Sequence, residues 1–508
     1  MSYRKTLLSA LVLLAACAGQ QAEQKPTAPP PPVTQVTAPA APAPDAFRDQ
    51  KPPPLAVTPQ FDAPVPEQAQ LSNGLTLLVV TNKALPLVSV DLLVKTGVDG
   101  EPKAKAGIAG FVAGTVDEGT KSKTALQVST AFEDVAARFY AMAGKEATTL
   151  HLNSPLETLP QALEVMADVA LHPAFRKVDV ERVRGALKNN LLQKKSYPAA
   201  LAQDEMAKQL YGTNHPWGQP AGGTLKTLAG ITRADLARFH QTWFRPNNAV
   251  ITFAGDISLA DARALAEQTF GGWKKAPLPK LSLPTPPAPG AQHVVLVPVP
   301  DASQSQVWTG TTLPLRATDP QAIPLRVANY PLGGLFSSRL NLNLREAHGY
   351  SYGVFSSVGY GNDGGQMVAR GGIVAKDTAP AVAEYEKELT RFSDGKVTPQ
   401  ELTQAKNAYI LSLPSVLETN DAVAGAMGGL VLHGLPLDYF KTLPAKVMAV
   451  SAADVQQVVT QYVKPSTWPI VVAGPAEAQA ALEKLNLGGV TLDPPEGATV
   501  KAKPAAKK

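Results

Sequence analysis

The sequence predicts an α+β protein in which one unit of helices and strands occurs twice. The first observation is a repeated segment: a capped helix, a proline turn and a buried strand occupy residues 231–255 and again residues 450–474. Corresponding residues of the two copies, such as Gly255 and Gly474, stand 219 positions apart. The second observation is that both halves open with apolar, strand-like runs. The third is the Pro-rich break at residues 277–289, which separates the halves.

The opening strands and the helices of each half follow from the spacing of apolar residues. Residues 75–80 form an apolar run, and Val88, Val90, Leu92 and Val94 alternate with other residues as in a half-buried strand. We expect residues 294–297 and 306–310 to play the same parts in the second half. Apolar side chains at helical spacing predict helices that face the core. These helices cover residues 159–170, 180–191 and 382–389.

The N-terminus has the pattern of an export signal that ends at Cys17. Arg4 and Lys5 precede an apolar run at residues 7–14, which is too short to span a bilayer as a helix. Leu14-Ala15-Ala16-Cys17 resembles the bacterial lipobox, in which the cysteine thiol is acylated after cleavage. The alternative is an ordinary signal peptide cut nearby, which would leave Cys17 as a free thiol. Several acyl chains on one cysteine would anchor the protein stably.

Several function classes are excluded by composition. Cys17 is the only cysteine, so the chain has no intramolecular disulfide and no thiolate metal cluster. The formal net charge of +5 lies partly in a lysine-rich C-terminal tail, and no basic stripe is interleaved with aromatic residues. We therefore expect no nucleic-acid partner. The Pro- and Ala-rich stretch that follows Cys17 cannot form a core and predicts an extended spacer.

These breaks divide the chain into six expected segments. They are a lipoprotein signal peptide (1–17), a disordered Pro/Ala-rich linker (18–66), an N-terminal domain (67–273), a second Pro-rich linker (274–291), a C-terminal domain (292–490) and a basic disordered tail (491–508).

Four stretches, taken in order, carry a resemblance to a known family. They are Leu71-Ser72-Asn73-Gly74-Leu75; residues 105–111 with 117–120; residues 211–218 with 246–249; and residues 332–340 with 344–346 and 349–352. Together they resemble the insulinase/pitrilysin (inverzincin) peptidases, and the resemblance covers nearly all of residues 68–490. It implies that each half is a metallopeptidase-like α/β sandwich of a mixed sheet and helices. It also implies that two such halves pair with two more to enclose a peptide.

The zinc motif of the active family members is missing from this chain. That motif, H-x-x-E-H, places two histidine ligands and a general-base glutamate on one helix. The matching positions here are Gly110-Phe111-Val112-Ala113-Gly114, and the third ligand, a glutamate in the family, matches Asn190. The resemblance therefore implies that Gly110, Ala113, Gly114 and Asn190 mark a degenerate site, and that this chain does not hydrolyse peptides alone.

The histidines do not suggest a replacement metal site. No two of the seven stand within five residues of each other, whereas zinc needs three or four converging ligands. We interpret each as a surface residue or a hydrogen-bonded core residue. A zinc enzyme with an unrecognised ligand set is the alternative that this spacing disfavours. We expect no cofactor in this chain and zinc in a partner subunit.

A second family motif is present. In active assemblies an Arg and a Tyr seven residues apart reach the zinc site from the opposing unit, and Arg345 and Tyr352 match that spacing. A phenol O–H aimed at the carbonyl oxygen would stabilise the charge that develops there, and a guanidinium would orient the substrate. The alternative is that Arg345 is a surface residue and Tyr352 an ordinary strand aromatic. Further candidates for substrate contact are Gly333, Gly334, His348 and Tyr350.

Two functions remain open on the sequence alone. In the first, this chain is the subunit without zinc of a heteromeric peptidase, and Arg345 and Tyr352 act in trans on peptide substrates. In the second, it is a catalytically inert scaffold or peptide-binding lipoprotein of the same fold, and the two residues are relics. In either case we expect a lipid-anchored protein of the bacterial cell envelope, at the outer membrane and facing the periplasm, because Ala18 rather than Asp follows Cys17.

Overall fold

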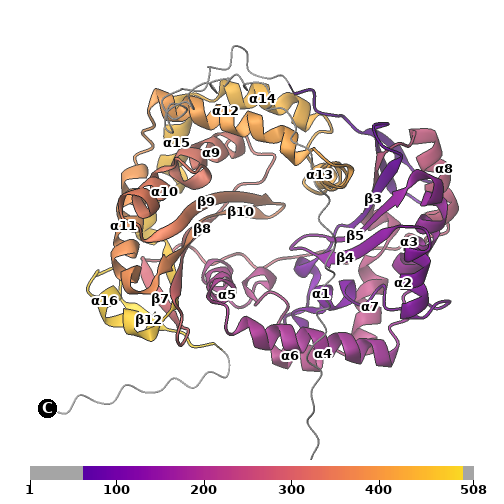
Figure 1. The fold of residues 1–508 in the computed structure, drawn as a ribbon, viewed down its shortest axis with the longest axis horizontal. Helices are drawn as coiled ribbons and strands as arrows, with labels where there is room; N and C mark the ends of the chain where they lie inside the picture. Colours follow the sequence, from indigo (N-terminus) through magenta and orange to yellow (C-terminus); the bar gives the residue numbers. More distant parts are fainter. Residues whose placement is uncertain (1–60, 496–508) are drawn as a thin grey trace, which may run out of the picture. The chain divides into compact units, whose positions relative to one another are not determined.

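The computed structural model describes residues 61–495, in which each half contains a six-stranded mixed sheet (Figure 1). The strand order is β1-β2-β6-β3-β5-β4 in the N-terminal sheet and β12-β7-β11-β8-β10-β9 in the C-terminal sheet. The N-terminal strands are β1 (Glu67–Gln70), β2 (Thr76–Thr81), β3 (Leu87–Val94), β4 (Arg138–Ala143), β5 (Thr148–Pro155) and β6 (Ala249–Gly255). The C-terminal strands are β7 (His293–Pro298), β8 (Gln304–Leu313), β9 (Ser351–Gly361), β10 (Gly364–Val374), β11 (Pro469–Gly474) and β12 (Val490–Leu492).

Five neighbouring strands of one sheet correspond in order and direction to five of the other. β2 runs parallel to β6, and β7 runs parallel to β11 in the same way. The next three neighbours are antiparallel in both sheets. Only the sixth strand differs, since β1 lies antiparallel to β2 whereas β12 lies parallel to β7. The predicted α+β fold of two duplicated halves is therefore confirmed.

Helices lie between the strands in both halves. In the N-terminal half they are α1 (Ile108–Ala113), α2 (Ala125–Glu133), α3 (Leu159–Leu171), α4 (Lys177–Lys194), α5 (Pro198–Tyr211), α6 (Leu225–Gly230), α7 (Arg233–Trp243) and α8 (Leu259–Phe270). In the C-terminal half they are α9 (Ala322–Asn329), the π-helical turn η6 (Tyr330–Gly334), α10 (Arg339–Asn341), the π-helical turn η7 (Leu342–Ala347), α11 (Thr378–Phe392), α12 (Pro399–Val416), α13 (Asn420–Leu432), α14 (Tyr439–Ala449), α15 (Ala452–Tyr462) and α16 (Gln479–Glu483).

The repeated segment folds in the same way in both copies. Thr232 caps α7 and Ser451 caps α15, and in each case an aspartate three residues later completes a capping box. A short 3-10 turn that begins with proline follows each helix. The strands that come next, β6 and β11, end at Gly255 and Gly474. The offset read from the sequence therefore identifies structurally equivalent residues.

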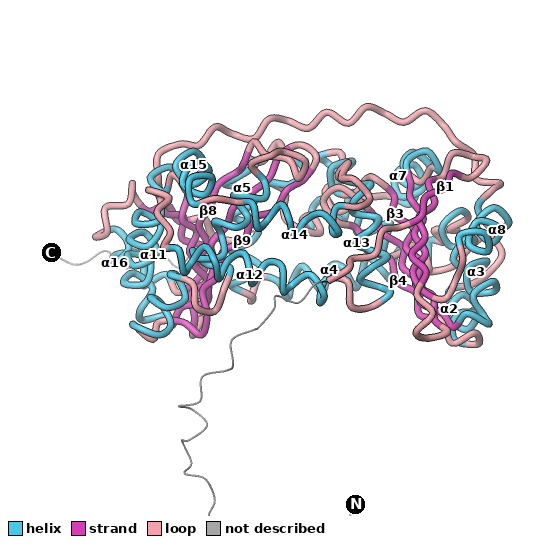
Figure 2. Tube along the Cα trace, turned by 90° about the horizontal axis from the view of Figure 1, so that it is seen from above, coloured by secondary structure: helices cyan, strands magenta, loops and turns pink. Residues whose placement is uncertain are grey.

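The two halves exchange a helix. Helices α3 and α8 cover one face of the N-terminal sheet, and α13 from the C-terminal half covers the other (Figure 2). In the C-terminal half α11 lies on one face of the sheet, and α5 from the N-terminal half packs on β8 and β11. Met427 of α13 shares a core with Leu78 and Val250, and Met206 of α5 shares one with Val471. Each half thus completes the core of the other.

This exchange buries both faces of β3, where the alternation in the sequence predicted a half-buried strand. Val88 and Val90 face the N-terminal core, but Ser89 and Asp91 on the opposite face are buried too. Helix α13 contacts β3 on that face, and its residue Asp421 accepts a hydrogen bond from the Ser89 hydroxyl. The residues of β3 on that face are polar although they are buried. The helix that covers them, α13, presents its polar N-terminal end with Asp421 to the strand.

The boundaries of the halves extend slightly beyond the expected ones. Ala63 is buried against the C-terminal core, so ordered structure begins before residue 67. Thr491 and Leu492 belong to β12, because their backbones pair with β7, whereas the sequence placed them in the tail. Residues 273–292 form neither helix nor strand. Cys17, residues 18–60 of the expected linker and residues 496–508 of the tail lie outside the described residues. Within residues 61–495, no helix combines the length and apolarity needed to cross a membrane.

Candidate functional site

Helix α1 carries most of the positions that the sequence comparison matched to the zinc motif, and it begins at a tightly built turn. Gly107 has φ +92°, and a Cβ there would lie 2.4 Å from the carbonyl oxygen of Gly222. The carboxylate of Glu101 accepts hydrogen bonds from the backbone N–H groups of Gly107 and Ala109, both at 2.8 Å, and so caps the first turn. Burial raises the pKa of Glu101 to about 7. The helix is therefore well formed although its catalytic side chains are absent.

The four degenerate positions offer no ligand. Gly110 on α1 and Gly114, which follows the last residue of α1, are exposed, and a Cβ at Gly110 would meet no atom within 4 Å. Ala113 is buried between them, and Asn190 is exposed on α4. Across the described part of the chain, no group of three or more His, Cys, Asp or Glu side chains is arranged to hold a metal ion. The residues present at this position do not fit zinc.

The histidines are spread over both halves, and most of them hydrogen-bond to the protein. The His240 Nε2 lies 2.9 Å from the carbonyl oxygen of Ala170, and burial lowers the pKa of His240 to about 4. His215 accepts from the backbone N–H of Trp217, and His151 contacts Asp91. The Nδ1 of His433 has no hydrogen-bond partner within residues 61–495 but lies 3.6 Å from Oε2 of Glu146. Each of these four histidines therefore contacts the protein itself.

Arg345 and Tyr352 are brought together at the start of the edge strand β9. Arg345 lies on the π-helical turn η7, and its Nη1 donates to the backbone carbonyl oxygen of Tyr352 at 3.0 Å. Its Nε lies 3.1 Å from Oε1 of Glu346, and its guanidinium lies 4.5 Å from the ring centre of Phe336. These contacts hold the guanidinium in one orientation next to the backbone that carries the tyrosine.

The Tyr352 side chain projects away from the protein. It is 84% exposed, and its hydroxyl has no hydrogen-bond partner within the described ranges of the chain. A bulge disturbs the pairing of β9 with β10 beside Tyr352, because the register shifts between Gly371 and Ile373. Bulges re-aim side chains and are frequent next to functional sites, as are π-helical turns. The arrangement presents a phenol O–H and a guanidinium on one surface.

The other sequence candidates take different places. Gly333 is buried against β9, and a Cβ there would lie 2.5 Å from the backbone nitrogen of Ser356, so the chain that approaches it is the protein's own strand. Gly334 is exposed. The rings of His348 and Tyr350 lie 5.1 Å apart, and the His348 Nδ1 lies 3.0 Å from the carbonyl oxygen of Asn343.

Sequence reasoning missed two aromatic residues of this surface. Phe336 and Phe355 are both exposed, Phe336 under the Arg345 guanidinium and Phe355 on the same strand as Tyr352. A Cβ at Gly353 would lie 2.7 Å from the Phe355 ring, so glycine lets this ring lie against the strand. Part of the signal was available, since Phe336 stands between Gly334 and Tyr352 and Phe355 follows Tyr352 by three residues, but their exposure depends on the turn η6 and on the bulge. We call Phe336, Arg345, Tyr352 and Phe355 the Arg–Tyr surface.

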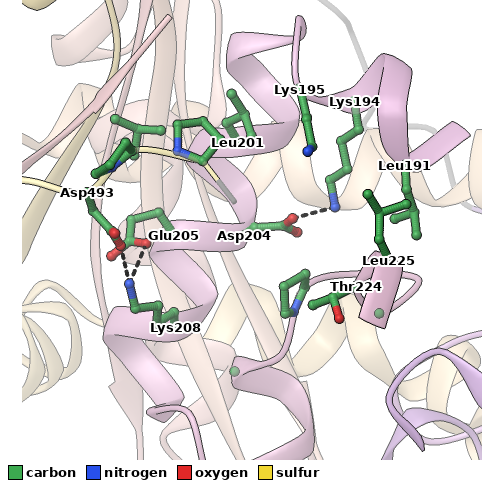
Figure 3. A pocket seen from close by; sticks show the side chains of 16 residues that line it. Leu191, Lys194, Lys195, Leu201, Asp204, Glu205, Lys208, Thr224, Leu225 and Asp493 are labelled. Carbon is green, nitrogen blue, oxygen red and sulfur yellow. Dashed lines mark hydrogen bonds and ion pairs between the residues drawn. The ribbon is translucent and has the colours of Figure 1, made fainter. Parts of the chain in front are cut away.

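A cavity of about 360 Å³ lies between α4, α5 and β7 (Figure 3). The Nζ of Lys194 lies 2.5 Å from Oδ2 of Asp204, and Lys208 pairs with both Glu205 and Asp493. Burial raises the pKa of Asp204 and of Glu205, and the lysines oppose this shift. Each of these acids is therefore paired with a lysine, and the Lys208–Asp493 pair joins the two halves. The cavity contains none of the sequence-predicted site residues.

Comparisons with known proteins agree with the fold. The family model described as "Insulinase (Peptidase family M16)" matches residues 77–221, and the model described as "Peptidase M16 inactive domain" matches residues 230–409. The uncharacterized zinc protease YmxG of Bacillus subtilis is 25% identical over 387 residues, which cover 76% of this chain and 92% of that protein. An uncharacterized zinc protease of Mycobacterium leprae is 26% identical over 363 residues, or 70% of this chain and 80% of that protein.

Solved structures show the same architecture. A peptidase M16 inactive domain from Pseudomonas fluorescens superimposes with a TM-score of 0.75 at 25% identity, covering 81% of this chain and 98% of that one. A protease from Helicobacter pylori gives a TM-score of 0.73 at 19% identity, covering 81% of this chain and all of that one. The second likeness concerns the fold alone.

Proposed function

We propose that this chain, which belongs to the insulinase-like M16 peptidase family, is the subunit without zinc of a heteromeric peptidase and contributes Arg345 and Tyr352 to the active site of a zinc-bearing partner chain. The observation that carries the proposal is a contrast between two surfaces. The zinc positions hold only Gly, Ala and Asn, whereas Tyr352 is exposed and Arg345 is oriented beside it. Loss of all function would not be expected to preserve the exposed Tyr352 and the oriented Arg345.

The chemistry of the Arg–Tyr surface suits peptide hydrolysis in trans. Zinc held by the partner would activate water for attack on the peptide carbonyl. Tyr352 would donate its O–H to the carbonyl oxygen as negative charge develops there, and a fixed donor of this kind is worth about 3–4 kcal/mol. Arg345 has Nη2 without an acceptor among residues 61–495, so it would hold a neighbouring substrate carbonyl in place. Phe336 and Phe355 would pack on apolar side chains of the peptide.

The proposal includes a place in the cell. Acylation of Cys17 would attach the subunit to the outer membrane on its periplasmic side, and residues 18–60 would act as a spacer between the lipid and the two folded halves.

The test is to mix the full chain with the H-x-x-E-H-bearing M16 chain of the same cell and to measure hydrolysis of an unstructured peptide. Tyr352→Phe removes one O–H and should lower kcat by about 10²–10³ while the complex still assembles. Tyr197→Phe is the matched control, because Tyr197 is an exposed phenol, at 60%, on a different surface. Arg345→Ala should raise KM, since it removes a substrate contact as well as the bond to the Tyr352 carbonyl.

Assembly is checked separately by gel filtration of each mixture. A Tyr352→Phe complex that assembles and cleaves at the wild-type rate would refute the catalytic role. The inert scaffold of the same fold would then be the better description of the chain.

A further inference from the structure

A smaller cavity lies within the C-terminal half, away from the Arg–Tyr surface. Helices α9, α12, α13 and α14 and the far end of β9 enclose about 230 Å³. Most of its lining is apolar or aromatic, and among the described residues that line it there is no aspartate or glutamate. The side chains that shape it are Ile323, Tyr360, Tyr409, Leu435, Tyr439 and Phe440.

Arg326 of α9 is the only arginine or lysine among the described residues that line this cavity, and His433 lines it as well. Its Nη1 donates to the hydroxyl of Tyr409 at 3.0 Å, and its guanidinium lies 5.2 Å from the ring centre of Tyr360 and 6.0 Å from that of Tyr409. No carboxylate within residues 61–495 forms an ion pair with it. Arg339 in the same half differs, because its Nε lies 2.7 Å from Oε1 of Glu401.

Arg326 stays charged in these surroundings. Burial lowers the pKa of Arg326, but the contacts with Tyr409, which accepts a hydrogen bond from the guanidinium, raise it, and the pKa lies above its usual value. Burial raises the pKa of Tyr360 and Tyr439 well above that of a free phenol, so both rings stay neutral. Arg326 is half-buried, and partial burial of a cation with no anion beside it costs free energy. A guanidinium presents parallel N–H donors that match a carboxylate.

We propose that this cavity binds a carboxylate attached to an apolar group, with the carboxylate on Arg326 and the apolar part among the tyrosine, phenylalanine and aliphatic walls. The C-terminal residue of a peptide and a free apolar acid share this chemistry. The site is separate from the Arg–Tyr surface, because Tyr352 and Tyr360 lie eight residues apart on β9, or about 26 Å along an extended strand. The proposal therefore does not depend on the catalytic role of Arg345 and Tyr352.

Calorimetric titration of the full chain in detergent tests the proposal with three probes. They are N-acetyl-Ala-Leu with a free C-terminal carboxylate, its C-terminal amide, and phenylacetate. At least one of the two acids should bind, and the amide should bind at least about tenfold more weakly than the peptide acid, because it cannot pair with Arg326. Tighter binding of the peptide acid identifies a peptide C-terminus as the ligand, and tighter binding of phenylacetate identifies a free acid. Absence of binding by both acids up to about 10 mM would overturn the proposal.

Two variants locate the binding site. Arg326→Met should weaken binding of the acid by at least about tenfold, whereas Arg391→Met, at an exposed arginine that pairs with Glu388, should leave it unchanged. Ile323→Trp keeps the arginine but fills the cavity, and it should abolish binding even if the first variant folds poorly. Wild-type affinity in Ile323→Trp, or in a folded Arg326→Met, would place the acid elsewhere and refute the assignment.

Discussion

Replacing His151 by alanine tests a buried polar cluster that joins the two halves. His151 on β5 is 4% exposed, and its Nδ1 lies 2.5 Å from Oδ1 of Asp91 on β3, which is 5% exposed. Its Nε2 lies 3.5 Å from Oδ1 of Asp421 on α13. Asp421 also accepts hydrogen bonds from Ser89 and Asn153. The imidazole thus stands between one carboxylate of the N-terminal sheet and one of the exchanged helix.

The expected loss of stability is large because the substitution leaves Asp91 as a buried carboxylate without a partner. Removing one member of a buried ion pair costs about 3–5 kcal/mol, which is a substantial part of the total stability of most proteins. Asp91→Asn combined with His151→Ala should recover part of this loss, since the uncompensated charge is then gone.

The loss should also depend on pH. Burial lowers the pKa of His151, but the bond to Asp91 and the charge of Asp421 outweigh it, so the pKa lies above its usual value. The stabilisation from protonated His151 is therefore fully present below about pH 6.5, the unfolded value, and is lost as the pH rises through the folded pKa. Asp421 has a lowered pKa, so its contribution is lost at the other end of the range, as the pH falls below about 4.

Urea unfolding of the full chain at pH 6 and pH 9, followed by circular dichroism, measures both effects. His172→Ala is the matched control, since this imidazole also lies near an aspartate, at 3.3 Å from Asp168, but is 52% exposed. It should cost less than about 1 kcal/mol. A loss for His151→Ala as small as that of the control, or one that does not shrink between pH 6 and pH 9, would refute the reasoning.

Three further predictions concern the metal, the membrane and the exchanged helix. The full chain, purified in detergent and dialysed, should hold no stoichiometric zinc, because Gly110, Gly114 and Asn190 provide no ligand; one zinc per chain by metal analysis would contradict this. Cys17→Ser should release the protein from the membrane fraction, and sedimentation of the variant with salt-washed membranes would place the anchor elsewhere. Met427→Ala should lower the free energy of unfolding by about 2–5 kcal/mol, because Met427 is 0% exposed in the core that α13 shares with the N-terminal sheet. The exposed Met448 is its control, and Met448→Ala should change the stability by less than about 0.5 kcal/mol.

Local chemistry made much of the fold predictable. The caps at Thr232 and Ser451 and the glycines that end β6 and β11 are properties of short segments, so the repeat could be recognised without knowing any contact between the halves. The flanking family motifs likewise predicted which positions match the zinc motif and the Arg345–Tyr352 pair. The orientation of that pair was not predictable, because it depends on a π-helical turn and a bulge that produce no local signal.

Only the tertiary structure revealed which surfaces meet. Alternation along β3 correctly identified the face of Val88 and Val90 but not the burial of Ser89 and Asp91, because the helix that covers them lies more than three hundred residues later in the chain. Arg326 stands among apolar residues of α9 with no distinguishing neighbour in sequence, and its cavity forms only when four elements of the C-terminal half converge on it. Periodicity reports whether a side chain faces an apolar surface, whereas the identity of that surface, and the charges that it brings, depend on contacts between distant parts of the chain.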